Sequence, residues 1–389
     1  MKDKQFFREK LLAWFAQNHR PLPWKGERDP YKIWLSEIIL QQTRVEQGLP
    51  YYQKFIEKYP HVRVLADAPE DEVLKLWEGL GYYSRARNLH TAAKFIAAEL
   101  GGEFPHTYED IRALKGVGDY TAAAIASFAF ALPHAVLDGN VYRVLARYFG
   151  IETPTDTGVA KKEFAALAQD LLDPARPGDF NQAIMDFGAT HCTPQQPKCS
   201  VCPFKNQCVA FQKGKVSELP VKSKVLEKKE RFFAYLVVNF QGNTFVRKRT
   251  DKDIWQNLWE FPVLELPVFP ADNRELEDAV WRHFFGLSTQ RHQTDSATQK
   301  HDGLTSSGQK HGAKITSISK PYRQTLTHRI VTAVFCEMRF PDDTPPDVFE
   351  KPPFENCLCV SRAELKKNIA VPRVIDWYLR DKAITLTFF

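Results

Sequence analysis

LKGVGDYTAAAIASFAFALPHAVLDGNVYRVLARYFG, residues 114–150, decides how the first half of this chain folds. Gly116 and Gly118 bracket Val117 in a tight turn, where a residue with a Cβ would struggle to reach positive φ. Such a turn directs backbone N–H groups outward, and N–H groups at a helix start attract phosphate. The stretch therefore predicts a phosphate-binding hairpin.

Two helices are predicted after this hairpin. Residues 119–130 are almost wholly small or apolar, which favours a helix buried on every side. Further on, Asp138-Gly139-Asn140 precedes an amphipathic run, so Asp138 falls where a helix N-cap is expected. Asp138 is then either an ordinary cap or an acid directed at a substrate that the hairpin holds.

The length and charge of the chain bound its class. A chain of 389 residues is too long for one ordinary core, so two domains of unequal size are expected. The balance of 53 Lys and Arg against 47 Asp and Glu gives a net charge of +6, which is compatible with nucleic acid. No run of eighteen apolar residues and no apolar leader occurs, so we expect an intracellular, cytoplasmic protein that does not bind a membrane.

The texture of the sequence changes along the chain. Residues 1–212 have apolar positions at helical spacing throughout, and residues 213–230 are basic and polar, as in a linker. Beyond them, FFAYLVVNF, TFVRKR and ITLTFF predict strands, and Gln241-Gly242-Asn243 predicts a hairpin turn between the first two. Helices are expected near 273–285 and 362–367, and a polar loop at 288–312.

Four of the seven cysteines are clustered in the pattern C-x6-C-x2-C-x5-C, formed by Cys192, Cys199, Cys202 and Cys208. Clustering of this kind indicates a metal site in place of a disulfide framework. Zinc and an iron–sulfur cluster both accept four thiolates, so the pattern alone leaves them equally favoured. The loop holds no spare ligand or catalytic acid, and a closed, structural site is expected.

Several motifs together resemble a known family. The hairpin, LDGNVYRVLAR and the cysteine spacing resemble the helix-hairpin-helix DNA glycosylases of the endonuclease III superfamily that carry a 4Fe-4S cluster. More narrowly, RPLPWKGERDPYKIWLSEIILQQTRV, GLGYYSRARNLH and FNQAIMDFGATHC resemble the MutY family of adenine DNA glycosylases, over residues 8–210. The resemblance implies an all-α helix-hairpin-helix glycosylase domain at residues 1–212, with a 4Fe-4S cluster in the loop 192–208.

Glu37 and Asp138 suit the chemistry that this resemblance implies. Breaking an adenine–deoxyribose bond requires a proton for the departing base and stabilisation of an oxocarbenium-like sugar. Glu37 lies among apolar residues in WLSEIILQQT, and desolvation there would raise its pKa so that it can donate that proton. Asp138, better hydrated at a helix start, would stay ionised and oppose the cationic sugar. The alternative for Glu37 is an ordinary, partly exposed helix glutamate.

The residues around these two carboxyls refine the expected reaction. Bifunctional members of the superfamily have a Schiff-base lysine where this chain has Tyr120, so water should be the nucleophile and strand cleavage weak. Asn140, two residues after Asp138, is counted as adjacent to the catalytic residues. In the hairpin, Lys115 stands where the family often has proline, and we expect it to contact phosphate together with residues 116–118.

Extruding a base from a duplex costs a few kcal/mol, which glycosylases offset by filling the gap with side chains. Gln42 and Tyr82 match the family positions that wedge into the helix. Trp24 and Gln182 match positions that line the adenine pocket. The alternative is that Tyr82 and Trp24 only pack in the core.

The C-terminal half resembles a Nudix domain. DIWQNLWEFPVLEL is similar to its start, but NRELEDAVWRHFFGLS lacks the full R-E-x-x-E-E signature that binds magnesium. We therefore expect residues 231–389 to form a catalytically silent α+β, Nudix-like domain that inspects 8-oxoguanine. Thr327 and His328 in YRQTLTHRI loosely match the family's recognition loop, where a threonine hydroxyl can hydrogen-bond the damaged base. A surface turn without a role is the alternative.

The leading hypothesis is a monomeric, monofunctional adenine DNA glycosylase of base excision repair, acting on double-stranded DNA with A:8-oxoguanine or A:G mispairs. A glycosylase of the same fold for thymine or uracil is less favoured, because pyrimidines do not need protonation at a purine nitrogen. A non-catalytic iron–sulfur DNA-binding protein and a nucleotide pyrophosphohydrolase are the remaining alternatives.

Overall fold

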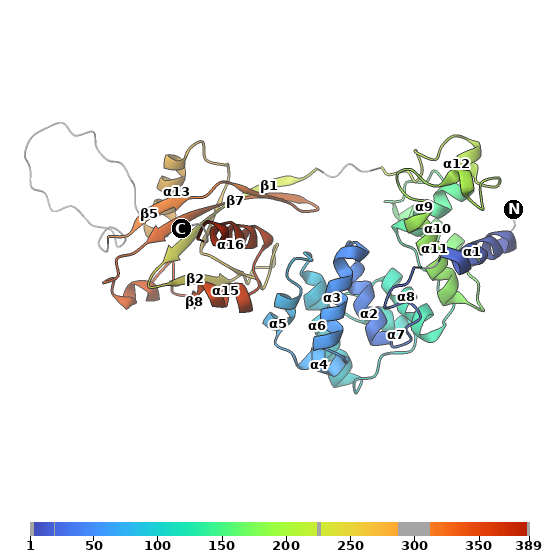
Figure 1. Ribbon diagram of the computed structural model, residues 1–389, viewed down its shortest axis with the longest axis horizontal. Helices are drawn as coiled ribbons and strands as arrows, with labels where there is room; N and C mark the ends of the chain where they lie inside the picture. The colour runs from blue at the N-terminus through green and yellow to red at the C-terminus, as the bar shows by residue number, and fades with distance from the viewer. Residues whose placement is uncertain (1–3, 19, 224–226, 287–311, 387–389) are drawn as a thin grey trace, which may run out of the picture. The chain divides into compact units, whose positions relative to one another are not determined.

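The computed structural model describes residues 4–18, 20–223, 227–286 and 312–386 (Figure 1). The chain forms two compact units, one made of Met1–Ala68 and Ser84–Val225 and the other of Pro69–Tyr83 and Leu226–Phe389. Almost all of the loop predicted at 288–312 lies outside the described residues. The predicted combination of an all-α first part and a sheet-containing C-terminal part is confirmed.

The first unit is helical throughout. Its helices are α1 (Lys4–Asn18), α2 (Pro30–Leu40), α3 (Val45–Lys58), α4 (Val62–Asp67), α6 (Ser84–Glu99), α7 (Tyr108–Ala113), α8 (Asp119–Phe130), α9 (Gly139–Phe149), α10 (Gly158–Leu171), α11 (Pro177–Thr190) and α12 (Val209–Gln212), with a 3-10 turn η1 (Cys199–Val201). Their boundaries follow local signals. Asp29 caps α2 by accepting a hydrogen bond from the Tyr31 N–H, and Thr107 and Thr157 cap α7 and α10 in the same way.

Helix α8 is the buried helix that its sequence predicts. Its residues from Thr121 to Ser127 are all buried, and Ala131 ends it in the left-handed conformation at φ 54°. Among the described residues, no helix combines the length and apolar character that crossing a membrane requires. The apolar surface of α8 is instead covered by neighbouring helices, which fixes the hairpin at its start to the core.

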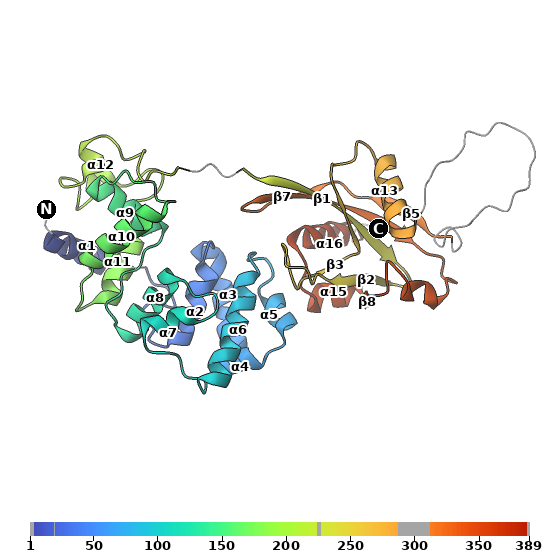
Figure 2. The ribbon, with the colours of Figure 1, turned by 180° about the vertical axis from the view of Figure 1, so that it is seen from behind.

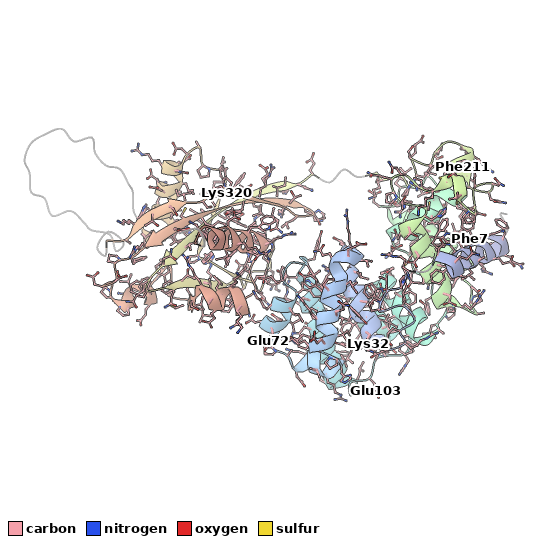
Figure 3. The ribbon with its side chains drawn as sticks, viewed as in Figure 1. Phe7, Lys32, Glu72, Glu103, Phe211 and Lys320 are labelled. Carbon is pink, nitrogen blue, oxygen red and sulfur yellow. The ribbon has the colours of Figure 1, made fainter. Side chains whose placement is uncertain are left out.

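An aromatic cluster joins the N-terminal helix to the cysteine loop. Phe7 of α1, labelled in Figure 3, is fully buried; its ring stacks on Phe204 with 4.9 Å between centroids and lies 4.9 Å from Tyr148 of α9. Aromatic pairs at such separations contribute about 0.5–1.5 kcal/mol beyond the area they bury. The cysteine loop is thus packed onto the helical core.

The segment expected to be a linker, residues 213–230, is partly structured. Leu219 is only 3 % exposed, its carbonyl accepts a hydrogen bond from Arg147 Nε at 2.9 Å, and the Thr155 N–H donates to Val221 O at 3.0 Å. Strand β1 (Lys229–Asn239) includes the last residues of the segment. Isolated apolar residues therefore attach the first part of this polar segment to the helical unit.

The second unit contains two sheets. β4 (Val263–Leu266), β1, β7 (Arg329–Arg339) and β5 (Lys314–Ile318) lie in that order, and β6 (Tyr322–Thr325) also pairs with β7; β1 and β7 are parallel and the other pairs antiparallel. β3 (Trp259–Glu260), β2 (Asn243–Lys248) and β8 (Leu358–Ser361) form the second sheet, next to α15 (Arg362–Asn368) (Figure 2). The unit also contains α5 (Glu70–Leu76), α13 (Asn273–Phe285), the 3-10 turn η2 (Pro346–Glu350) and α16 (Arg373–Leu386).

The alternation of side chains along β1 explains how helices cover the larger sheet. Ala234, Leu236 and Val238 form a core with Leu276 and Val280 of α13. The intervening Tyr235 stacks on Phe335 of β7, which stacks at 4.1 Å on Tyr378 of α16. Because successive side chains of a strand point to opposite faces, α13 and α16 cover opposite faces of this sheet, as Figure 1 also shows.

The secondary-structure predictions for the second unit hold with one exception. The hairpin turn is confirmed by reciprocal hydrogen bonds between Phe240 and Asn243, with Gln241 and Gly242 at positive φ. The helices at 273–285 and 362–367 are also confirmed. The strand predicted for ITLTFF is wrong for residues 384–386, which are the last residues of helix α16, because the long helical segment before them overrides their local β preference; residues 387–389 lie outside the described residues.

Candidate active site

Glu37 lies on α2, a helix buried along nearly its whole length. The Asp29 cap and Pro30 at the first helical position set where the helix starts, so Glu37 falls in its third turn. Its side chain is 7 % exposed. The alternative interpretation of Glu37 as a partly exposed helix glutamate is therefore wrong.

A hydrogen bond from helix α8 positions the Glu37 carboxyl. The Tyr120 hydroxyl, from the first turn of α8, donates to Glu37 Oε2 at 2.7 Å. Burial raises the pKa of Glu37 to about 7; the Tyr120 hydrogen bond acts in the opposite direction, and the nearby Asp138 charge adds to the increase. Burial likewise raises the pKa of Tyr120 well above its usual value, so this phenol remains a neutral donor.

Asp138 is the N-cap of α9, as its sequence position predicts. Its Oδ1 accepts from the Val141 N–H at 2.8 Å and its Oδ2 from the Asn140 amide at 2.7 Å. Asp138 is half-buried and so more exposed than the buried Glu37, as expected, although desolvation still raises its pKa. The Val141 and Asn140 hydrogen bonds and the Arg143 charge act in the opposite direction and favour the ionised form.

Asn140 connects Asp138 to the cysteine loop. Arg143 of α9 donates from Nη2 to Asn140 Oδ1 at 2.8 Å and to Gly188 O at 2.6 Å, and from Nε to Cys192 O at 2.8 Å. A Cβ on Gly188 would lie 2.6 Å from the Asn140 Cβ, so α11 approaches α9 this closely only with glycine at that position. The sequence did not reveal this role, since the two residues are far apart along the chain.

A cavity of about 340 Å³ opens beside Glu37. It is lined by Phe15, Ala16, Trp24, Lys25, Gly26, Glu27, Arg28, Ile33, Ser36, Glu37, Phe128, Gly178, Asp179 and Gln182. Both residues expected to line a base pocket, Trp24 and Gln182, are therefore at one cavity with the buried acid. Its volume is in the range of small-molecule pockets.

The cavity wall contains a buried ion pair that the sequence did not indicate. Lys25 Nζ donates to Asp186 Oδ2, and the two side chains are 11 % and 4 % exposed. Asp186 lies on α11 one turn after Gln182, so the pair ties the loop that carries Trp24 to the helix that carries Gln182. Burial lowers the pKa of Lys25, and the Asp186 carboxylate opposes that effect.

The predicted hairpin joins α7 to α8. Gly116 has φ 81°, and a Cβ there would lie 2.6 Å from the Asn88 Cβ, so this glycine is required. Gly118 has φ −100° and open space where a Cβ would lie, so the expected need for glycine at that position is wrong. Lys115 is exposed and Val117 is buried, which leaves Lys115 on the surface of the turn.

Gln42 and Tyr82, the two expected wedge residues, share an uncommon backbone conformation. Their φ angles are 54° and 47°, in the left-handed region that side chains other than glycine rarely adopt. Both side chains are exposed, Tyr82 by 47 %. Strained conformations of this kind concentrate at functional sites.

In the second unit, Thr327 and His328 lie at the tip of the hairpin between β6 and β7, which the Leu326 N–H closes by donating to Arg329 O at 2.8 Å. The Tyr82 hydroxyl and Thr327 Oγ1 share a hydrogen bond. The structure thus brings together two residues that the sequence indicated for separate roles.

The four clustered cysteines line one small cavity with Arg147, Lys198 and Lys205. Burial raises the pKa of Cys199, of Cys208 and, to about 12, of Cys202, and the neighbouring cysteines contribute to each increase. Arg147 Nη1 lies 3.5 Å from Cys192 Sγ. Within the described residues, no three His, Cys, Asp or Glu side chains are grouped so as to hold a single metal ion.

The comparison with known families matches the helical unit. The model of the HhH-GPD superfamily of base excision DNA repair proteins matches residues 35–169, which include the hairpin, Glu37 and Asp138. The solved structure of a thermostable thymine-DNA glycosylase is similar to this chain with a TM-score of 0.51 and 33% identity, over 54% of this chain and 97% of that one. The buried Glu37, the hairpin and the helix-capping Asp138 therefore belong to a glycosylase fold of this superfamily.

Relatives with higher sequence identity indicate which family of DNA glycosylases this chain belongs to. The adenine DNA glycosylase of Buchnera aphidicola (subsp. Schizaphis graminum) is 40% identical over 268 residues, which span 67% of this chain and 76% of that protein. The adenine DNA glycosylase of Homo sapiens is 46% identical over 222 residues, 55% of this chain and 41% of the human protein. This chain belongs to the adenine DNA glycosylase family.

Proposed function

We propose that this protein is a monofunctional DNA glycosylase that removes adenine mispaired with 8-oxoguanine or guanine by hydrolysis of the N-glycosidic bond. The observation that carries the proposal is a protonatable, buried Glu37 at a cavity lined by Trp24 and Gln182. Membership of the adenine DNA glycosylase family supports the choice of base. The likeness to a thymine-DNA glycosylase concerns the shared fold.

In the proposed reaction the protonated Glu37 carboxyl transfers its proton to a ring nitrogen of the extruded adenine. The bond between the base and C1′ then breaks, and its electron pair leaves with adenine. The Asp138 carboxylate, held by the Val141 N–H and the Asn140 amide, stabilises the cationic sugar. Water adds to C1′ and returns a proton to Glu37, which restores the enzyme.

The absence of an amine at position 120 supports hydrolysis by water. Tyr120 donates its hydroxyl proton to Glu37 and has a raised pKa, so it is a poor nucleophile. Its role is to orient the acid. We therefore expect an abasic site as the product, without strand cleavage.

The cysteine cavity supports a 4Fe-4S cluster bound by Cys192, Cys199, Cys202 and Cys208. Four cysteine sulfurs around one cavity are a donor set that fits such a cluster. When bound, the cluster would join four positions of the loop 192–208 covalently to one another. Absorbance in the visible charge-transfer region with iron analysis tests the assignment, and a colourless protein with one bound zinc contradicts it.

The C-terminal region, residues 231–389, is proposed to be a catalytically silent, Nudix-like domain that recognises 8-oxoguanine. The mixed sheet with α13 on one face supports the resemblance. On α13, Glu275 Oε2 accepts the Ala271 N–H at 2.7 Å and so stabilises the start of the helix. The hairpin tip formed by Thr327 and the exposed His328 is the proposed contact with the damaged base, and Thr327 shares a hydrogen bond with Tyr82.

A labelled duplex with one A opposite 8-oxoguanine, treated with the protein and then with alkali, tests the function. We expect an alkali-labile site at adenine, little cleavage without alkali, and loss of activity in Glu37→Gln. A matched duplex with T opposite G should stay intact. Cleavage at T, or full activity of Glu37→Gln, would refute the proposal.

A further inference from the structure

Arg85, in the first turn of α6, reaches the C-terminal end of α2. Its Nη1 group lies 2.9 Å from Ile38 O and 2.9 Å from Ile39 O, and also donates to Gln41 O. Thr43 Oγ1 lies 3.4 Å from Nη1 and 3.3 Å from Nη2. One half-buried guanidinium is thus shared by the end of α2 and by the turn that follows it.

This end of α2 is only partly capped by its own backbone, through the Gln41 N–H to Glu37 O and the Thr43 N–H to Leu40 O. The last carbonyls of a helix lack partners within the helix, and a cation at that end is favourable. The last turn of α2 contains no basic residue, and its C-cap, Gln41, is not in the left-handed conformation that commonly closes a helix. Arg85 supplies, from a different helix, donors for the Ile38 and Ile39 carbonyls and a positive charge.

The turn held by Arg85 contains Gln42. Arg85 binds the residues on both sides of it, Gln41 and Thr43, and the Gln41 amide also donates to Thr121 Oγ1 of α8 at 3.1 Å. Gln42 itself is at φ 54° with its side chain exposed. Because the flanking residues are anchored, the uncommon backbone of Gln42 is imposed by its neighbours.

We propose that Arg85 is a positioning residue that holds Gln42 ready to fill the gap left when adenine is extruded from the duplex. The inference rests on the proposed wedge role of Gln42. It requires arginine specifically, because a planar guanidinium with several fixed donors can serve carbonyls of two successive segments at once, whereas the lysine ammonium is a compact point charge. Arg85 acts through Gln42 and does not contact the reacting atoms.

Single-turnover adenine excision by Arg85→Met, measured on two duplexes, tests this role. One duplex has adenine paired opposite 8-oxoguanine, and the other has the same adenine within a bubble of unpaired bases. We expect excision from the paired duplex to slow by about 10- to 100-fold, since a small misplacement of a positioning group has effects of this size. Excision from the bubble should change by less than about threefold, because an unpaired base needs less help to leave the stack.

Three further variants make the test specific. Lys94→Met removes one positive charge from the exposed face of the same helix and should leave both rates unchanged. Arg85→Lys should remain as slow as Arg85→Met on the paired duplex. In a protein that already carries Gln42→Ala, Arg85→Met should slow excision from the paired duplex little further, because both changes disable the same wedge.

Equal slowing on both duplexes, or full additivity with Gln42→Ala, would overturn the inference and show that Arg85 supports the chemistry or the fold in general. Failure of the proposed function gives a different result, namely no excision by the unmodified protein on either duplex. In that case 2-aminopurine fluorescence reports base extrusion directly. An Arg85→Met protein that extrudes 2-aminopurine as well as the unmodified protein then refutes the inference.

Discussion

Replacing Tyr120 with phenylalanine should move the pH dependence of excision upward. The proposed reaction needs protonated Glu37, whose pKa is raised to about 7, so the rate of excision should fall as pH rises through about 7. The Tyr120 hydroxyl donates to Glu37 Oε2 at 2.7 Å and stabilises the carboxylate, and it therefore lowers this pKa. Without the hydroxyl, protonated Glu37 persists to higher pH.

The size of the effect follows from the hydrogen bond. A hydrogen bond to a charged group contributes about 1.5–3 kcal/mol, and a pKa change of one unit corresponds to about 1.4 kcal/mol. The pH at which the excision rate falls to half its maximum, the midpoint, should therefore rise by about one to two pH units in Tyr120→Phe. Single-turnover excision of adenine opposite 8-oxoguanine, measured between about pH 5 and 9, determines this midpoint. The maximal rate at low pH should also decline, because the carboxyl loses its orienting partner.

Tyr31→Phe is the matched control. Tyr31 is on the same helix as Glu37, and its buried hydroxyl donates to Tyr59 O at 2.6 Å, away from the acid. It should lower stability without moving the midpoint. An unchanged or lowered midpoint in Tyr120→Phe, or an equal shift in Tyr31→Phe, would contradict the assignment of Glu37 as the acid held by Tyr120.

Three further predictions concern stability. Glu37 has a folded-state pKa of about 7 against an ordinary 4.5, so its ionisation opposes folding above pH 4.5. Glu37→Gln should therefore raise the free energy of unfolding by up to about 3 kcal/mol at pH 8 and change it little at pH 4. Equal denaturation curves of the two proteins at pH 8 would contradict this. Lys25→Met should lower the free energy of unfolding by about 3–5 kcal/mol, because it leaves the Asp186 carboxylate buried and unpaired. The double variant Lys25→Met with Asp186→Leu should recover much of this stability. A double variant as unstable as Lys25→Met would argue against the ion pair. Gly188→Ala should lower the free energy of unfolding by about 1–3 kcal/mol, because the new Cβ meets Asn140. Gly158→Ala, with open space around its Cβ, should be neutral or slightly stabilising. Similar melting temperatures for the two variants would refute the close approach of α11 to α9.

Much of the helical unit and of its site was accessible from the sequence. The small and apolar run 119–130 predicts the buried helix α8, and Asp138 before an amphipathic run predicts the cap of α9; both depend on residues only a few positions apart. The apolar surroundings of Glu37 likewise predicted a raised pKa, which the structure supports. Local spacing is sufficient for such features because caps and helix faces are set within one or two turns.

Tertiary structure decided the features that join distant segments. The bonds from Tyr120 to Glu37, from Lys25 to Asp186 and from Arg85 to the end of α2 link residues between 44 and 161 positions apart. None leaves a local pattern, since each depends on how helices pack. Asp138 shows both levels: its position before an amphipathic run determined that it caps a helix, whereas the elements packed around that cap determine the desolvation that raises its pKa.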